Sequence, residues 1–229
     1  MTKKIDILGL SLDNYTVREA IRQVETFLEN NVLNTIENIS MQMLIDAEES
    51  ETLREVIQGL DLAIIGEKEI LQVAGIDTMQ RIRETEENDF AYEFFKRVER
   101  NSKSVFLLGQ SEERVLNEKE HLLKDFPKLI IAGEYALENC VGDFEAVIND
   151  MNAMIPDVIV SILPTPMQEE FFLSHRDKMN ANIWYGEGEL GLGSRTGGVR
   201  GFFRKLARRG RLKNSIEKYR RRLLESEEQ

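Results

Sequence analysis

The chain has few of the residues that build covalent or metal-held frameworks. Among its 229 residues are one cysteine, Cys140, and two histidines, His121 and His175. A single cysteine forms no internal disulfide, and neither histidine has a cysteine or second histidine at ligand spacing. GxSxG, HExxH and CxxC motifs are also missing. The sequence therefore predicts no metal site and no cofactor, and it gives no support to nucleophilic catalysis.

Long apolar runs and prolines are scarce too. No stretch approaches the roughly eighteen apolar residues of a membrane span, and the N-terminus lacks an apolar run followed by a small-residue cleavage site. We therefore expect a cytoplasmic protein whose membrane contacts, if any, are peripheral. Only four residues are proline, while 41% are hydrophobic and 31% charged, which is typical of a globular rather than a disordered or fibrous chain.

Charge divides the chain into two parts. The net charge is −11, yet the segment from Arg195 to Arg222 holds twelve lysines and arginines and one acid, Glu217. Residues 1–194 hold eighteen basic residues against thirty-seven acidic ones. We therefore expect an α/β domain at residues 1–194 and a basic, amphipathic, helical C-terminal appendage at residues 195–229.

Short apolar runs alternate with amphipathic segments along the first part. The predicted strands are residues 4–14, 35–40, 61–66, 104–109, 128–135, 158–163 and 182–188. The predicted helices are residues 17–28, 41–47, 53–57, 90–98, 115–123, 144–151 and 168–179. Thr16 and Glu19 have the spacing of a capping box at the first helix. Apolar strands alternating with helices indicate a Rossmann-like, mainly parallel sheet with helices on both faces.

In such a sheet, ligands bind at the carboxyl ends of the strands, and three strand ends here offer candidate residues. Gly109 precedes a helix whose first N–H groups could bind a phosphate; a structural tight turn is the alternative. Gln168 follows Pro164 and Pro166, where its amide could grip a sugar or base hydroxyl, or merely cap a helix. Glu67 follows a buried strand and is a candidate general base; the alternative is that it is a solvated loop acid, of which this acidic chain has many.

The basic appendage interleaves apolar and basic residues at helical spacing. Residues 202/206 and 212/216/219/223 form an apolar stripe with arginines beside it. Three interpretations compete: the helix lies on an anionic membrane leaflet, contacts nucleic-acid phosphates, or pairs with the acidic body. We favour the leaflet and expect no nucleic-acid partner, because the acidic body would repel a polyphosphate everywhere except at the appendage.

The order of these segments and their amino-acid sequences resemble those of the WecG/TagA/CpsF glycosyltransferases. The resemblance is carried by residues 5–14, 53–55 with 61–62, 105–109, 127–133, 156–157 and 166–169. It implies an inverting, metal-independent enzyme that moves a sugar such as N-acetylmannosamine from UDP to an undecaprenyl-diphosphate-linked acceptor. Such an enzyme would work at the inner face of the cell membrane, in envelope polysaccharide or teichoic acid synthesis, and a homo-oligomer is compatible with it.

The resemblance also assigns roles to residues. Asn38, Ser40 and Gln168 would hold the nucleotide sugar, and Arg83 matches a family arginine region. Arg211, Arg220 and Arg221 of the appendage would offset charge on the UDP leaving group.

This chain departs from the family at several places. Glu87 replaces the glycine that follows the family arginine, and residues 186–195 lack the family's phenylalanine-aspartate pair and Arg-Ala-Pro motif. Asn38-Ile-Ser40 stands where the family has Thr-x-Asn, and Gly66-Glu67 stands where it has the Asp-Gly that supplies the proposed base. Glu67 is the expected substitute base. The alternative hypothesis is a catalytically inactive relative that serves as a membrane-associated binding or scaffolding protein.

Overall fold

A single sheet organises the computed structural model, which describes residues 4–191 and 199–227. Its strands are β1 (Lys4–Ile7), β2 (Leu10–Asp13), β3 (Asn34–Ile39), β4 (Leu62–Ile65), β5 (Ser104–Gly109), β6 (Ile130–Ala136), β7 (Val158–Ser161) and β8 (Ile183–Gly186). Their order is β1-β2-β4-β3-β8-β7-β5-β6, and all neighbours are parallel except β1 and β2. The predicted α/β class and the mainly parallel sheet are confirmed.

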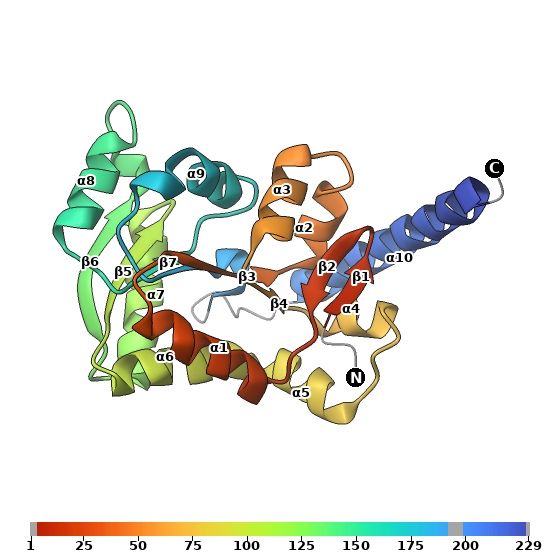
Figure 1. The fold of residues 1–229 in the computed structure, drawn as a ribbon, viewed down its shortest axis with the longest axis horizontal. Helices are drawn as coiled ribbons and strands as arrows, with labels where there is room; N and C mark the ends of the chain where they lie inside the picture. The colour runs from red at the N-terminus through yellow and green to blue at the C-terminus, as the bar shows by residue number, and fades with distance from the viewer. Residues whose placement is uncertain (1–3, 192–198, 228–229) are drawn as a thin grey trace.

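Helices cover both faces of this sheet (Figure 1). On one face lie α1 (Val17–Glu29), α6 (Asp89–Arg100) and α7 (Glu112–Asp125). On the other lie α2 (Met41–Asp46), α3 (Glu51–Gly59), α8 (Glu145–Ala153) and α9 (Met167–His175). The predicted capping box at α1 is confirmed: Thr16 accepts from the Glu19 backbone N–H, and Glu19 accepts from the Thr16 N–H at 3.0 Å.

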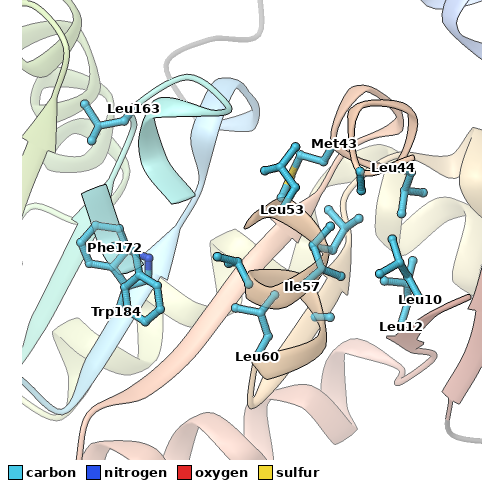
Figure 2. Packing of buried hydrophobic residues seen from close by; sticks show 14 of the residues in the cluster. Leu10, Leu12, Met43, Leu44, Leu53, Ile57, Leu60, Leu163, Phe172 and Trp184 are labelled. Carbon is cyan, nitrogen blue, oxygen red and sulfur yellow. The ribbon is translucent and has the colours of Figure 1, made fainter. Parts of the chain in front are cut away.

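The core is divided between the two faces because side chains alternate along each strand. On β5, Val105 and Leu107 pack with the α1, α6 and α7 side, while Phe106 and Leu108 pack with the α3, α8 and α9 side. Figure 2 shows the second side, where Phe172 of α9 lies against Trp184 of β8 with ring centroids 5.2 Å apart. Strands buried on both faces explain the continuous apolar runs in the sequence.

The N-terminal segment differs from its prediction. Residues 4–14 form a hairpin rather than one strand, because the chain reverses at Leu8 and Gly9, which have φ of 59° and 76°. Ile5 pairs with Leu12 and Ile7 with Leu10. A left-handed φ suits glycine, so Gly9 supplies the turn that the alternation pattern concealed.

The middle of the chain also holds elements that were not predicted. After β4 come α4 (Lys68–Val73) and α5 (Met79–Glu87), and short 3₁₀ turns occur at Leu137–Asn139, Arg176–Lys178 and Gly188–Leu190. The strand expected at 158–163 ends at Ser161, although the Ile162 N–H still donates to the Leu108 carbonyl oxygen of β5 at 2.9 Å. Thr165-Pro166 is a cis peptide bond at the start of α9.

The C-terminal appendage is the long helix α10 (Val199–Glu227), blue in Figure 1. Its inner stripe packs on α2 and α4, with Leu212 and Ile216 buried and Tyr219 partly buried. Part of the predicted apolar stripe is therefore used by the protein itself. Within the described residues, no helix combines the length and apolar composition needed to cross a membrane.

Candidate active site

A small pocket lies where the strand order reverses, between β3 and β8. On one side of β3 lie β4, β2 and β1, which all precede β5 in the chain. On the other side lie β8, β7, β5 and β6, which come later in the chain. The pocket is therefore at the switch point of the sheet, where α/β proteins bind ligands. The cavity has a volume of about 100 Å³. Its lining residues are Asn38, Ser40, Gln42, Met43, Glu67, Thr165, Glu187, Gly188, Glu189, Leu190 and Arg208.

Two predicted binding residues, Asn38 and Ser40, meet in this pocket after β3. The Asn38 amide donates to the Tyr185 hydroxyl at 2.9 Å, and its own Oδ1 has no hydrogen-bond partner among the described residues. Ser40 is the N-cap of α2, where its hydroxyl accepts from the Met43 N–H at 3.1 Å. Both side chains therefore have fixed positions at the pocket wall.

The predicted base, Glu67, lines the same pocket at the end of β4. Its Oε2 accepts the Met41 N–H at 2.6 Å, which holds the carboxylate at the N-terminus of α2. The preceding residue, Gly66, has no space beside it, because an added Cβ would overlap Cδ1 of Leu190. Leu190 therefore occupies the room that a side chain at position 66 would need.

Gln168 lies deeper than expected. Its side chain is buried beneath β8, where the amide nitrogen would be 2.5 Å from a Cβ added to Gly186. Thr165, four residues before Glu169, lines the pocket and donates to Glu169 Oε1 at 3.0 Å. Gln168 is therefore one layer behind the pocket lining rather than part of it.

Around Gln168 are two buried acids, Glu37 of β3 and Glu169 of α9. Burial and the charge of Glu169 raise the pKa of Glu37 well above its usual range, and burial also raises the pKa of Glu169. Trp184 and Gln168 face the Glu37 carboxyl and favour its charged form. Neither closes a hydrogen bond of normal geometry, so both Glu37 oxygens are unpaired among the described residues. Burial and the neighbouring charge of Glu169 therefore favour the protonated form of Glu37 in the folded protein.

A second buried acid, Glu187, lies on the opposite face of the sheet. Burial first, and Glu118 of α7 second, raise its pKa well above the usual range, while Tyr185 and Arg114 lower it. Arg114 also donates to the carbonyl oxygens of Ile162 at 3.0 Å and Gly188 at 2.8 Å. It thereby fixes the turn that carries Glu187 and Leu190 into the pocket.

The appendage reaches the pocket through Arg208, which was not among the predicted residues. Arg208 lies 3.9 Å from Glu189, and both line the cavity. It is one helical turn before Leu212 on the same stripe, so the helical spacing contained the signal. The predicted Arg211, Arg220 and Arg221 are exposed and are not among the lining residues.

Two further predicted residues lie elsewhere. Arg83 is on the exposed side of α5, where it faces Glu87 at 3.9 Å. Gly109 ends β5, and its lack of a side chain admits Val115 and Ile162, which lie 2.5 and 3.2 Å from an added Cβ. The nearby start of α7 is already bound by an acid, since the Glu112 N–H donates to Glu138. The structure therefore gives Gly109 a packing role, and a phosphate there would compete with Glu138.

The pocket is acidic, and Arg208 is the one cation among the described residues that line it. Glu67, Glu187 and Glu189 line it together with Arg208. Within residues 4–191 and 199–227, no group of three or more His, Cys, Asp or Glu residues has an arrangement suited to a metal ion. The available chemistry is hydrogen bonding, proton acceptance by a carboxylate, and charge compensation by arginine.

Known proteins provide the comparison for this arrangement. The chain is 22% identical over 189 residues to an enzyme from Staphylococcus aureus strain NCTC 8325 / PS 47, described as N-acetylglucosaminyldiphosphoundecaprenol N-acetyl-beta-D-mannosaminyltransferase. The same identity and description apply to the enzyme from strain MRSA252, and both matches cover 82% of this chain and 74% of the relative. A sequence model of the glycosyl transferase WecG/TagA/CpsF family matches residues 5–190. Because this match covers most of the chain, and the residues of the switch-point pocket up to Leu190 lie within it, the chain belongs to the WecG/TagA/CpsF family of glycosyltransferases.

Proposed function

We propose that the protein transfers a sugar of the N-acetylmannosamine type from a UDP-sugar to an undecaprenyl-diphosphate-linked acceptor. The observation that carries the proposal is the convergence of Asn38, Ser40 and Glu67 on one pocket, with Arg208 of the appendage at its mouth. Strand ends supply the sugar-binding groups, and the appendage supplies positive charge. Relatives named as N-acetylmannosaminyltransferases support this choice of donor and acceptor.

In the proposed reaction, an acceptor hydroxyl oxygen attacks the anomeric carbon of the donor sugar. The bond to the UDP oxygen breaks, its electron pair leaves with UDP, and Glu67 takes the hydroxyl proton. A single displacement inverts the anomeric configuration, and arginine in place of a metal stabilises the departing diphosphate. Arg208 is the nearest described candidate for that charge, with Arg211, Arg220 and Arg221 further along the same helix.

Membrane association belongs to the same proposal. The inner stripe of α10 packs on the body, so its outer side, which includes Arg211, Arg220 and Arg221, is the part available to an anionic leaflet. Each basic residue near such a surface contributes about 1 kcal/mol. The protein would then bind its acceptor lipid at the inner face of the cell membrane as a peripheral protein, either as a monomer or as a homo-oligomer.

A direct assay measures UDP release from UDP-N-acetylmannosamine in the presence of a short-chain lipid-linked N-acetylglucosamine acceptor. We expect turnover in the wild type and a loss of about a hundredfold or more in Glu67→Gln, since general-base catalysis contributes roughly 10²–10⁴. Ser40→Ala, which changes a neighbouring pocket residue, serves as the comparison. Equal rates in wild type and Glu67→Gln would remove Glu67 as the base.

One observation favours the second candidate, a catalytically inactive binding or scaffolding relative. Position 66 carries no side chain, and Leu190 fills the space beside it. Glu67 is meanwhile engaged by the Met41 N–H. Binding of UDP without turnover of any UDP-sugar would favour this candidate over the enzyme.

A further inference from the structure

The floor of the pocket carries polar groups with unused hydrogen-bonding capacity. Asn38 is 4% exposed and Glu187 is fully buried, and both line the cavity. Asn38 Oδ1 and the two Glu187 carboxyl oxygens have no closed hydrogen bond within the described part of the chain. Leaving a buried polar group unsatisfied costs about 1–3 kcal/mol, so native proteins keep few of them without a reason.

The orientation of these groups is fixed from behind. The Asn38 amide nitrogen is committed to the Tyr185 hydroxyl, so its oxygen is the part left for the pocket. The Tyr185 hydroxyl also faces Glu187 and lowers its pKa, without a hydrogen bond of normal geometry. Arg114 fixes the turn after Glu187 through Gly188. The unpaired atoms are therefore held in place before any ligand arrives.

Charge and size restrict what these atoms bind. Glu67 and Glu189 around the cavity disfavour a phosphate or a carboxylate, and Arg208, whose side chain is 25% exposed, lies nearer the solvent than the buried Asn38 and Glu187. The cavity volume of about 100 Å³ is below the roughly 300–1,000 Å³ that holds a complete small ligand. An uncharged group of a few atoms fits both limits.

From this geometry we infer that Asn38 and Glu187, supported by Tyr185, form a hydrogen-bonding subsite for a hydroxyl or N-acetyl amide group of a sugar. Glu187 is the residue that sets which sugars bind, and the phosphates lie outside, toward Arg208. This inference rests on the proposed function for the identity of the sugar. The surroundings of Glu187 agree with it: burial and Glu118 raise the pKa of Glu187, and a protonated carboxyl both donates and accepts, as a sugar hydroxyl does.

The test uses the full chain and two free sugars, N-acetylmannosamine and N-acetylglucosamine, followed by saturation-transfer NMR. We expect wild type to bind at least one of them, and Glu187→Ala and Asn38→Ala each to weaken that binding by about tenfold, the effect of a lost hydrogen bond of roughly 1.4 kcal/mol. Glu187→Gln keeps a donor and an acceptor of the same shape, so its affinity should stay within about threefold of wild type. If Glu187→Ala does not fold, Asn38→Ala and Glu187→Gln carry the test.

Glu37→Gln is a matched control, because Glu37 is equally buried and has a raised pKa but faces away from the cavity lining. Its affinity for the free sugars should equal that of wild type. Absence of sugar binding in wild type, or equal binding in wild type, Glu187→Ala and Asn38→Ala, would overturn the inference. Failure of the UDP-release assay together with Glu187-dependent sugar binding would instead reject the transferase and keep the subsite.

Discussion

The buried carboxyl pair Glu37 and Glu169 makes a sharp prediction about how stability depends on pH. Both groups have a raised pKa in the folded protein, so the folded state holds a proton that the unfolded chain has released above the ordinary glutamate value of 4.5. For an acid shifted in this direction, the stabilisation is complete below the unfolded pKa and is lost as the pH rises through the folded pKa. The perturbation is Glu37→Gln, which keeps the shape and removes the titration.

The magnitude follows from the number of protons involved. Each proton held only by the folded state makes the free energy of unfolding fall by about 1.4 kcal/mol per pH unit. The slope begins near the ordinary glutamate value and continues until the folded group ionises. Glu37→Gln should remove about one such contribution, while the raised pKa of Glu169, which comes first from its own burial, should remain. The variant should therefore be more stable than wild type at neutral pH and similar to it near pH 4.5.

Urea denaturation from about pH 5 to about pH 8 measures this difference, with the free energy of unfolding extrapolated to water at each pH. The wild-type curve should fall more steeply than that of Glu37→Gln. Glu113→Gln, on the exposed side of α7, controls for removing one negative charge from an acidic protein. Parallel curves for wild type and Glu37→Gln would refute the idea that this pair holds a proton in the folded state.

Two further predictions concern packing around the site. Gly66→Ala should destabilise by about 1–3 kcal/mol because its methyl group overlaps Leu190. Most of that cost should disappear in a Leu190→Ala background, as a double-mutant cycle in urea would measure, and additive effects would show that the cost does not come from Leu190. Leu212→Ala should loosen α10 from α2, since truncating a buried leucine costs about 2–5 kcal/mol, and hydrogen exchange should show faster amide exchange in α10. Leu224→Ala, at a 64% exposed position of the same helix, should leave that exchange unchanged, and equal protection in both variants would contradict the docking of α10.

Much of the fold follows from local sequence, because its signals act over a few residues. The box of Thr16 and Glu19 and the apolar runs buried on both faces are of this kind. The hairpin was concealed by its alternation, although the change from odd positions (Ile5, Ile7) to even ones (Leu10, Leu12) marks the turn. The α4 and α5 region is polar and has weak hydrophobic periodicity, so no local signal distinguished its helices from a loop.

The site was predictable to the extent that it depends on strand ends. Asn38, Ser40 and Glu67 meet because parallel strands bring their carboxyl ends to one edge. The depth of Gln168 and the exposure of Arg83 depend on how α9 and α5 pack, which is long-range information. Glu187 directly follows a predicted strand, but its importance comes from burial against Glu118, which lies sixty-nine positions earlier in the chain.

The contact between the two ends of the chain affects how truncation experiments should be interpreted. The Tyr219 hydroxyl of α10 would be 2.8 Å from a Cβ on Gly9, in the turn between β1 and β2, and the Arg54 guanidinium donates to Leu8 in the same turn. Leu212 and Ile216 share a core cluster with Met41 and Met43. Removing residues 195–229 would therefore expose an apolar surface and remove the Tyr219 contact to the hairpin turn, as well as discarding basic charge. Charge-reversal variants at Arg220 and Arg221, which are exposed, would test the proposed attachment to lipid without disturbing the fold, which deletion cannot do.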